Sequence, residues 1–116
     1  YFIGYVSDDE LPYLYRCAEI FSFVSLYEGF GLPPLEAMAS GVPVVVSDAP
    51  ALCEVGADAV LNAPAGEPEE IAARFSSVLD DKTLKNDMID AGLKRAAFFT
   101  WDETARATAR VYRQTL

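Results

Sequence analysis

The sequence of 116 residues contains no histidine and only two cysteines. Without histidine, this chain has no Ser-His or Cys-His dyad, no imidazole acid/base chemistry and few routes to a zinc site. Cys17 and Cys53 form no CxxC motif and are too few for a disulfide framework, so we expect two buried free thiols in a reducing cytoplasm. Any catalytic histidine would have to come from outside this sequence.

Basic residues are also scarce over most of the chain, whose net charge is −9. Residues 1–81 hold 14 acids against Arg16 and Arg74, and residues 82–116 hold seven bases against four acids. Nucleic acid is not expected as a partner of the acidic part, because backbone binding needs clustered Lys or Arg. The basic part predicts a solvated helix face, with peripheral contact to a membrane surface or a protein partner as the alternative.

No apolar run approaches the twenty or so residues that cross a bilayer, and no secretory segment is visible. With 52% hydrophobic residues, the chain is expected to form one globular domain over residues 1–116. Because it starts Tyr-Phe-Ile-Gly without an initiator Met, we expect it to be a piece of a longer protein.

Short apolar runs alternate with longer segments of helical period, which predicts an α/β fold with a parallel sheet and crossover helices. Strands are expected over residues 1–6, 20–24, 42–47 and 59–61, and helices from about 11, then over 33–40, 69–79, 83–98 and 101–116, with a short helix in 48–54.

Local signals refine the ends of these helices. Ser7 or Asp8 is expected to cap the first, with Leu11, Leu14 and Ala18 on its core face. Gly41 is expected to stop the second helix. For the last helix we expect Thr100 or Asp102 as the cap and Trp101 as an anchor to the body.

The carboxyl ends of parallel strands form the ligand-binding rim of open α/β sheets. The loops after Val6, Val24 and Ser47 are therefore expected to bring residues 4–7, 25–36 and 47–54 to one rim. Asp48 and Glu54 lie on this rim by the same reasoning, although a helix-cap role is as good an explanation for either.

The middle loop, EGFGLPPLE, carries the most chemistry, with Glu28 and Glu36 at its two ends. Gly29 and Gly31 let the backbone approach a ligand closely, and a proline suits a first helical position. Amides at a helix start favour an anion such as a diphosphate, while carboxylates accept hydrogen bonds from hydroxyls. The pattern predicts a site for a polyol attached to a phosphate, with its cations supplied from before Tyr1.

The run SLYEGFGLPPLEAMASGVPVVVSD resembles the donor-binding signature of retaining GT-B glycosyltransferases, the large family typified by sucrose synthase and bacterial mannosyltransferases. The resemblance extends to FIGYVSDDELPYLY, LCEVGADA and FTWDETARATARVY. It implies a Rossmann-like parallel sheet with flanking helices, part of a C-terminal nucleotide-sugar donor-binding domain whose N-terminal acceptor domain is absent from this sequence.

The resemblance also implies roles for individual residues. Glu28 would be the catalytic residue and contact hydroxyls of the donor sugar, and Glu36 would bind the ribose. Backbone amides between them would meet the sugar and the diphosphate, and backbone near the first strand would meet the base. The donor-binding set is then Glu28, Gly29, Phe30, Gly31, Leu32 and Glu36, with Tyr5 and Val6 as weaker base-binding candidates.

The implied reaction is retaining transfer of a hexosyl group from a GDP- or UDP-linked donor to a glycan, lipid or small-molecule acceptor. No cofactor and no metal is expected, because helix amides and cations suit a leaving diphosphate. We expect an internal-return mechanism, a cytoplasmic enzyme that contacts the inner face of the membrane at most, and an isolated fragment that is inactive.

Two alternatives stay open. A non-catalytic nucleotide-sugar binding or interaction module would keep the same loop, whereas sugar-nucleotide epimerases of this architecture normally use histidine and are disfavoured.

Phe30, Leu35 and Met38 are most simply packing residues, since apolar side chains at such spacing usually face a core.

Overall fold

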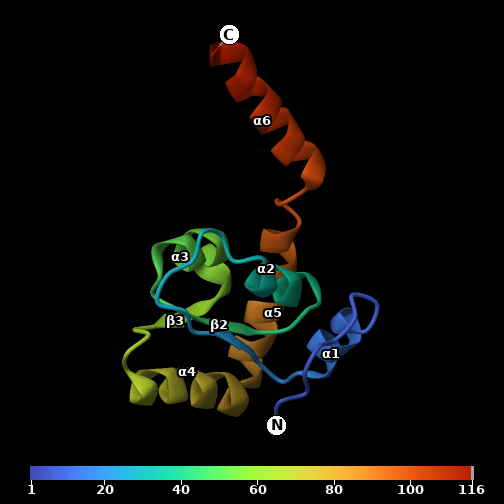
Figure 1. Cartoon of the computed structure of the whole chain (residues 1–116). Helices are drawn as coiled ribbons and strands as arrows, with labels where there is room; N and C mark the ends of the chain where they lie inside the picture. The colour runs from blue at the N-terminus through green and yellow to red at the C-terminus, as the bar shows by residue number, and fades with distance from the viewer. Residues whose placement is uncertain (116) are drawn as a thin grey trace.

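The computed structural model describes residues 1–115 and is built around a three-stranded parallel sheet (Figure 1). The strands β1 (Phe21–Phe23), β2 (Val44–Ser47) and β3 (Leu61–Ala63) lie in that order. Phe21 pairs with Val44, and Val45 pairs with Leu61. The expected α/β architecture, a Rossmann-like parallel sheet with flanking helices, is confirmed.

The strand β2 is the centre of the molecule. Val44, Val45, Val46 and Ser47 each have 0% of their surface exposed. A strand covered on both faces has no solvent side, which is why its sequence is a continuous apolar run and not an alternating one.

Helices cover both faces of this sheet. In residues 1–115 the helices are α1 (Leu11–Cys17), α2 (Leu32–Ala39), α3 (Pro50–Gly56), α4 (Pro68–Asp80), α5 (Lys82–Ala96) and α6 (Trp101–Thr115), and a 3-10 turn, η1 (Ala57–Ala59), follows α3. Figure 1 shows α3 on one side of β2 and β3 and α4 on the other. The helix α5 packs against both α2 and α4 and so joins the two layers.

Local sequence sets the helix ends. The helices α2, α3 and α4 each have proline in their first two positions, where a missing N–H costs nothing. Gly41, at φ +75°, ends α2 as expected. Asp81 caps α5 by accepting hydrogen bonds from the amides of Thr83 at 2.8 Å and Leu84 at 3.0 Å.

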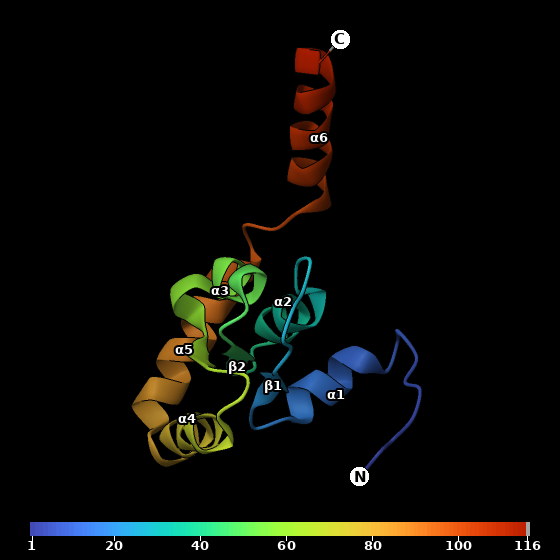
Figure 2. The ribbon, with the colours of Figure 1, turned by 60° about the vertical axis from the view of Figure 1, so that its left-hand side comes forward.

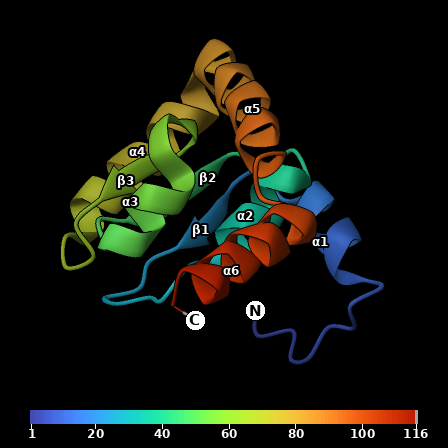
Figure 3. The ribbon, with the colours of Figure 1, turned by 90° about the horizontal axis from the view of Figure 1, so that it is seen from above.

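The expected strand over residues 1–6 is wrong. This segment has no regular secondary structure, and Tyr1, Phe2 and Tyr5 are at least 90% exposed. A strand forms only where its backbone groups pair with a neighbour, and β1 pairs only with β2. Figures 2 and 3 show this segment beyond α1, away from the sheet.

The helix α1 presents a different face to the core from the one expected. Leu11 and Ala18 pack against it, but between them Tyr15 is buried, whereas Leu14 is 45% exposed. The expected cap by Ser7 or Asp8 is also wrong, because Glu10 is the N-cap residue. The Ser7 hydroxyl donates to the Glu10 carboxylate at 2.7 Å and lowers the pKa of that carboxyl.

Both thiols are free, but the expectation that they are buried is wrong. Cys17 is exposed in the last turn of α1, and Cys53 is half-buried in α3, where its sulfur accepts a hydrogen bond from Asn62 Nδ2 at 3.5 Å. The exposure of a thiol in a short helix depends on which face of the helix carries it, and the residue type alone does not reveal that face.

The helix α6 leaves the body and projects outward (Figures 1 and 2). Thr100 caps it, because its hydroxyl accepts from the Glu103 amide at 3.2 Å. Trp101 was expected to anchor this helix to the body, which is wrong, because its side chain is 82% exposed. The chain turns away from the core before it reaches Trp101. Leu116, included in the expected helix, lies outside the described residues. Among residues 1–115, no helix is long and apolar enough to cross a membrane.

Met38→Ala is expected to lower the free energy of unfolding by about 2–5 kcal/mol, because it leaves a cavity where α2 meets Gly92 of α5. Val111→Ala on the exposed α6 is the control and is expected to change it by less than about 0.5 kcal/mol. Urea unfolding measures both, and equal losses would show that α6 belongs to the cooperative core.

Candidate functional site

The glycine turn (residues 28–32) follows β1 at the carboxyl end of the sheet and is tied to β2. The buried Ser47 hydroxyl donates to the Ser25 carbonyl at 2.5 Å. The Ser25 hydroxyl donates in turn to the Glu28 carboxylate at 2.7 Å. Two serines thus connect the end of the central strand to the first acid of the motif, and the expected meeting of these loops at one rim is confirmed for them.

The loop after β2 is joined to the loop after β3. The Asp48 amide donates to the Ala63 carbonyl at 3.1 Å, and its carboxylate accepts from the Ala65 amide at 3.4 Å. Asp48 does not cap α3, whose N-cap residue is Ala49. Asp48 therefore lies on the rim as expected and organises the loops there.

Gly31 fixes the path of the glycine turn. It is buried, and its φ of +110° lies in the left-handed region that disfavours side chains. A Cβ atom built on it would lie 2.7 Å from Leu52 Cδ2 of α3. The backbone of the turn therefore rests directly on α3, and a side chain at this position would force Leu52 to shift.

The start of α2 offers fewer amides than a typical helix. Leu32 is its first residue, and the two that follow, Pro33 and Pro34, carry no N–H. The Leu35 amide already donates to the Gly31 carbonyl at 3.4 Å. The backbone N–H groups at a helix start have no acceptor within the helix. In α2, only the N–H groups of Gly31 and Leu32 are of this kind and could bind an anion.

Glu36, the second acid of the motif, is exposed in the middle of α2. Its carboxylate accepts a hydrogen bond from the Tyr15 hydroxyl of α1 at 2.9 Å. Burial raises the pKa of the Tyr15 phenol above its ordinary value, and the hydrogen bond to Glu36 and its charge raise it further. Each acid of the motif is therefore held by its own hydroxyl donor, Glu28 by Ser25 and Glu36 by Tyr15.

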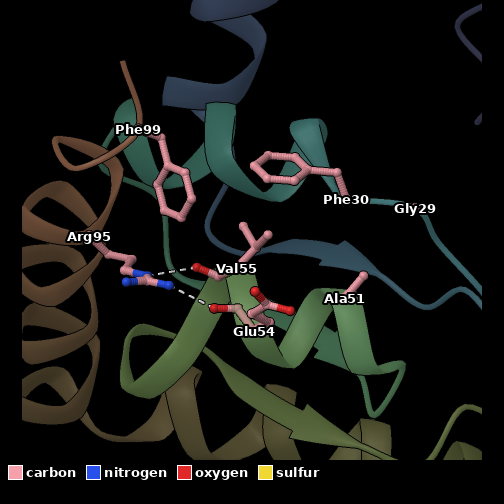
Figure 4. A pocket seen from close by; sticks show the side chains of 7 residues that line it. All are labelled: Gly29, Phe30, Ala51, Glu54, Val55, Arg95 and Phe99. Atoms are coloured by element: carbon pink, nitrogen blue, oxygen red, sulfur yellow. Dashed lines mark hydrogen bonds between the residues drawn. The ribbon is translucent and has the colours of Figure 1, made fainter. Parts of the chain in front are cut away.

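Two hollows flank the glycine turn. The larger, of about 520 Å³, is mostly apolar and includes Leu32, Trp101 and one charged residue, Glu36. The smaller, of about 180 Å³, lies between the turn, α3 and the end of α5 (Figure 4). Its lining residues are Gly29, Phe30, Ala51, Glu54, Val55, Arg95 and Phe99.

Arg95 is the functional candidate that the sequence did not point to. It comes from the end of α5, yet it lines the smaller hollow together with Gly29 and Phe30 (Figure 4). We expected the basic residues of 82–116 to lie on a solvated helix face, and no local motif relates position 95 to position 30. Only the packing of α5 against the rest of the fold brings this cation to the turn.

The remaining expected residues lie in three different settings. Tyr5 and Val6 lie in the N-terminal segment, which all three views place away from the glycine turn (Figures 1, 2 and 3). Met38 and Leu35 pack in the core as expected. Phe30 is 42% exposed and packs at the surface against Phe99.

Metal ligands are not gathered in the described chain. Residues 1–115 contain no group of three or more Cys, Asp or Glu side chains placed to hold a metal ion. Glu54, on the rim as expected, faces the smaller hollow with its carboxylate (Figure 4), while its carbonyl accepts from Arg95.

The model of the family described as glycosyl transferases group 1 matches residues 1–95. The chain belongs to this family. The match covers the sheet, the glycine turn, the helices α1 to α4 and all but the last residue of α5, and it confirms the resemblance that the motif EGFGLPPLE indicated.

Sequence relatives in the family include two bacterial mannosyltransferases. The chain is 42% identical over 112 residues to an O-antigen chain mannosyltransferase B of Escherichia coli, with 97% of this chain and 29% of that protein covered. It is 41% identical over 116 residues to an MMP alpha-(1->4)-mannosyltransferase of Mycolicibacterium hassiacum, with 96% and 28% covered. The chain thus spans less than a third of the length of these relatives.

Solved structures show the same fold. A sucrose-phosphate synthase from Thermosynechococcus elongatus superposes with a TM-score of 0.86 at 28% identity, over 97% of this chain and 29% of that one. The C-terminal domain of a glycosyl transferase group 1 family protein from Francisella tularensis gives 0.74 at 30% identity, over 83% and 51%. The expected relation to GT-B C-terminal domains is confirmed.

Gly31→Ala is expected to lower the free energy of unfolding by about 1–3 kcal/mol, because a left-handed alanine is strained and its Cβ meets Leu52. Gly29→Ala is the matched control, since a Cβ there meets nothing within 4 Å, and we expect a change below about 1 kcal/mol. Urea unfolding compares the two. Equal tolerance of both would show that the turn does not rest on α3 as described.

Tyr15→Phe is expected to change the dependence of stability on alkaline pH. The folded state raises the phenol pKa above its ordinary 10.0, so the stabilisation from Tyr15 is complete below that pH and is lost as pH rises beyond it. The gap in melting temperature between the wild type and Tyr15→Phe should therefore narrow above about pH 10. Tyr13→Phe, on the exposed side of α1, is the control. If the difference in melting temperature stays constant from neutral to alkaline pH, folding does not raise the phenol pKa of Tyr15.

Proposed function

We propose that this chain supplies the donor site of a retaining glycosyltransferase and binds a nucleoside-diphosphate hexose at the glycine turn. One observation carries the proposal: Gly31 and Leu32, whose amides have no acceptor within the first turn of α2, lie on the chain between two carboxylates that are held in place by separate hydroxyl donors. Backbone amides suit the diphosphate, and carboxylates suit the hydroxyls on either side of it.

The two acids take different parts of the donor in this proposal. Glu28 is half-buried and tied to the sheet end through Ser25, which suits a residue that orients the transferred ring. Its Oε1 accepts from Ser25, which leaves Oε2 for a sugar hydroxyl. Glu36 similarly accepts from Tyr15 on Oε2 and keeps Oε1 for the ribose. The amides of Gly29, Phe30, Gly31 and Leu32 lie between them on the chain.

The chemical contribution of this site is electrostatic. Departure of the diphosphate leaves an oxocarbenium-like sugar, and fixed amide donors stabilise the negative charge that develops on the leaving group. The two prolines of α2 limit these donors, so cations must add to them. We propose transfer with retention by internal return on one face of the sugar, with no metal and no covalent adduct on Glu28.

The mannosyltransferase relatives favour mannose as the transferred hexose. The titration below identifies the base, guanine or uracil, and we assign it no contact with Tyr5 or Val6, because their segment lies away from the glycine turn. The acceptor, whether glycan, lipid or small molecule, would bind to a part of the protein outside this sequence. We place the protein in the cytoplasm, with membrane contact limited to the surface.

The direct test records amide signals of the 15N-labelled chain during titration with GDP, UDP and their hexose derivatives. Saturable shifts confined to residues 28–36 with one nucleotide are expected, because the free amides of the turn gain a partner on binding. Glu36→Ala should weaken the affinity by about tenfold, as expected for loss of a charged hydrogen-bond partner.

Glu69→Ala is the matched control, since Glu69 is an exposed acid in the first turn of α4. It should bind like the wild type. Well-dispersed spectra without shifts at millimolar GDP and UDP would contradict the proposal for this chain, and shifts that survive Glu36→Ala would contradict the role given to Glu36.

A further inference from the structure

The glycine turn has a second support besides Leu52. Phe30 meets Phe99 edge-on, with ring centroids 5.7 Å apart and an interplanar angle of 82°. Phe99 follows α5, so this contact joins the turn to a distant part of the chain (Figure 4). Edge-to-face pairs at this distance are attractive, and they also fix the relative direction of the two rings.

Arg95 holds Phe99 and α3 together. Its guanidinium lies 4.9 Å from the centre of the Phe99 ring. Its Nε donates to the Val55 carbonyl at 2.8 Å, and its Nη2 donates to the Glu54 carbonyl at 2.7 Å. These carbonyls belong to the last turn of α3, where a helix leaves its acceptors unpaired and where a positive charge is favoured.

The short helix α3 thus supports the glycine turn in two ways, directly and through Arg95. Leu52 of α3 supports Gly31 directly, while Glu54 and Val55 hold Arg95, Arg95 lies over the ring of Phe99, and Phe99 meets Phe30. The smaller hollow is the space that these groups enclose. A shift of the guanidinium would release Phe99 and with it one of the two supports of the turn.

We propose that Arg95 is a positioning residue for the glycine turn: by bridging the carboxyl end of α3 to the Phe99 ring, it sets the place of Phe30 and hence of the Gly31 and Leu32 amides. The proposal rests on the proposed function for its consequence, which is that affinity for a nucleoside diphosphate depends on a residue that does not touch it. Its structural part, an ordered turn, stands independently.

The side-chain type matters for this role. A planar guanidinium presents parallel donors to two carbonyls and stacks its face on a ring at the same time. A lysine ammonium keeps the charge but is a compact point with no plane to stack. Arg95→Lys therefore separates geometry from charge.

The experiment uses the 15N-labelled chain with Arg95→Gln, Arg95→Lys and Asp81→Ala. Asp81 caps the opposite end of the same helix, so Asp81→Ala weakens α5 without approaching the turn. In the free chain, Arg95→Gln and Arg95→Lys should both shift the amide signals of residues 29–32 and lower their heteronuclear NOE values. The Kd for the nucleoside diphosphate, GDP or UDP, should rise by about tenfold, as expected when a positioned group is misplaced. Asp81→Ala should change neither.

The other outcomes are equally informative. Wild-type turn signals in Arg95→Gln would overturn the proposal, as would a weaker Kd with unchanged turn signals, which would mean direct contact with the ligand. Full rescue by Arg95→Lys would assign the effect to charge and overturn it too. If the wild type binds neither GDP nor UDP, the proposed function fails, and the free-chain signals still decide the role of Arg95. Should Arg95→Gln not fold, Phe99→Leu keeps the carbonyl bonds, removes the ring and should loosen the same amides.

Discussion

Strand β2 is paired on both edges and covered on both faces, and the site depends on that burial. Its residues Val44 to Ser47 are fully enclosed, so the strand has a single register with β1 and β3. Because Ser47 is the last of them, its hydroxyl is held at a fixed point on the rim, where it meets the Ser25 carbonyl. The position of Glu28 therefore follows from the packing of the core.

The glycine turn shows how few interactions are needed to present backbone amides. Gly31 lies against Leu52, and Phe30 lies against Phe99, so the turn is supported by α3 and by the end of α5. Both prolines at the start of α2 remove donors, so in the proposed donor site the diphosphate depends on the amides before them. A site with so few donors depends on their exact placement more than a site with many.

Sequence reasoning was reliable where local chemistry decides the outcome. The apolar run of β2, the Gly41 stop and the motif EGFGLPPLE led to the right sheet, the right helix and the right family. It failed where partners distant in the sequence decide. Residues 1–6 have the composition of a strand but no neighbour to pair with, and Tyr15 replaces Leu14 in the core because of how α1 lies. Arg95 reaches the turn only through helix packing.

In the proposed donor site, the glycine turn binds a nucleoside diphosphate through its backbone, between two separately held carboxylates. A crystal structure of the chain with a nucleoside-diphosphate hexose bound is the decisive test. We expect diphosphate oxygens within hydrogen-bond distance of the Gly31 and Leu32 amides, ribose hydroxyls on Glu36 and sugar hydroxyls on Glu28, with the Ser25 and Tyr15 hydrogen bonds retained. A donor bound elsewhere on the chain, or bound at the turn without contact to either carboxylate, would rule out this site.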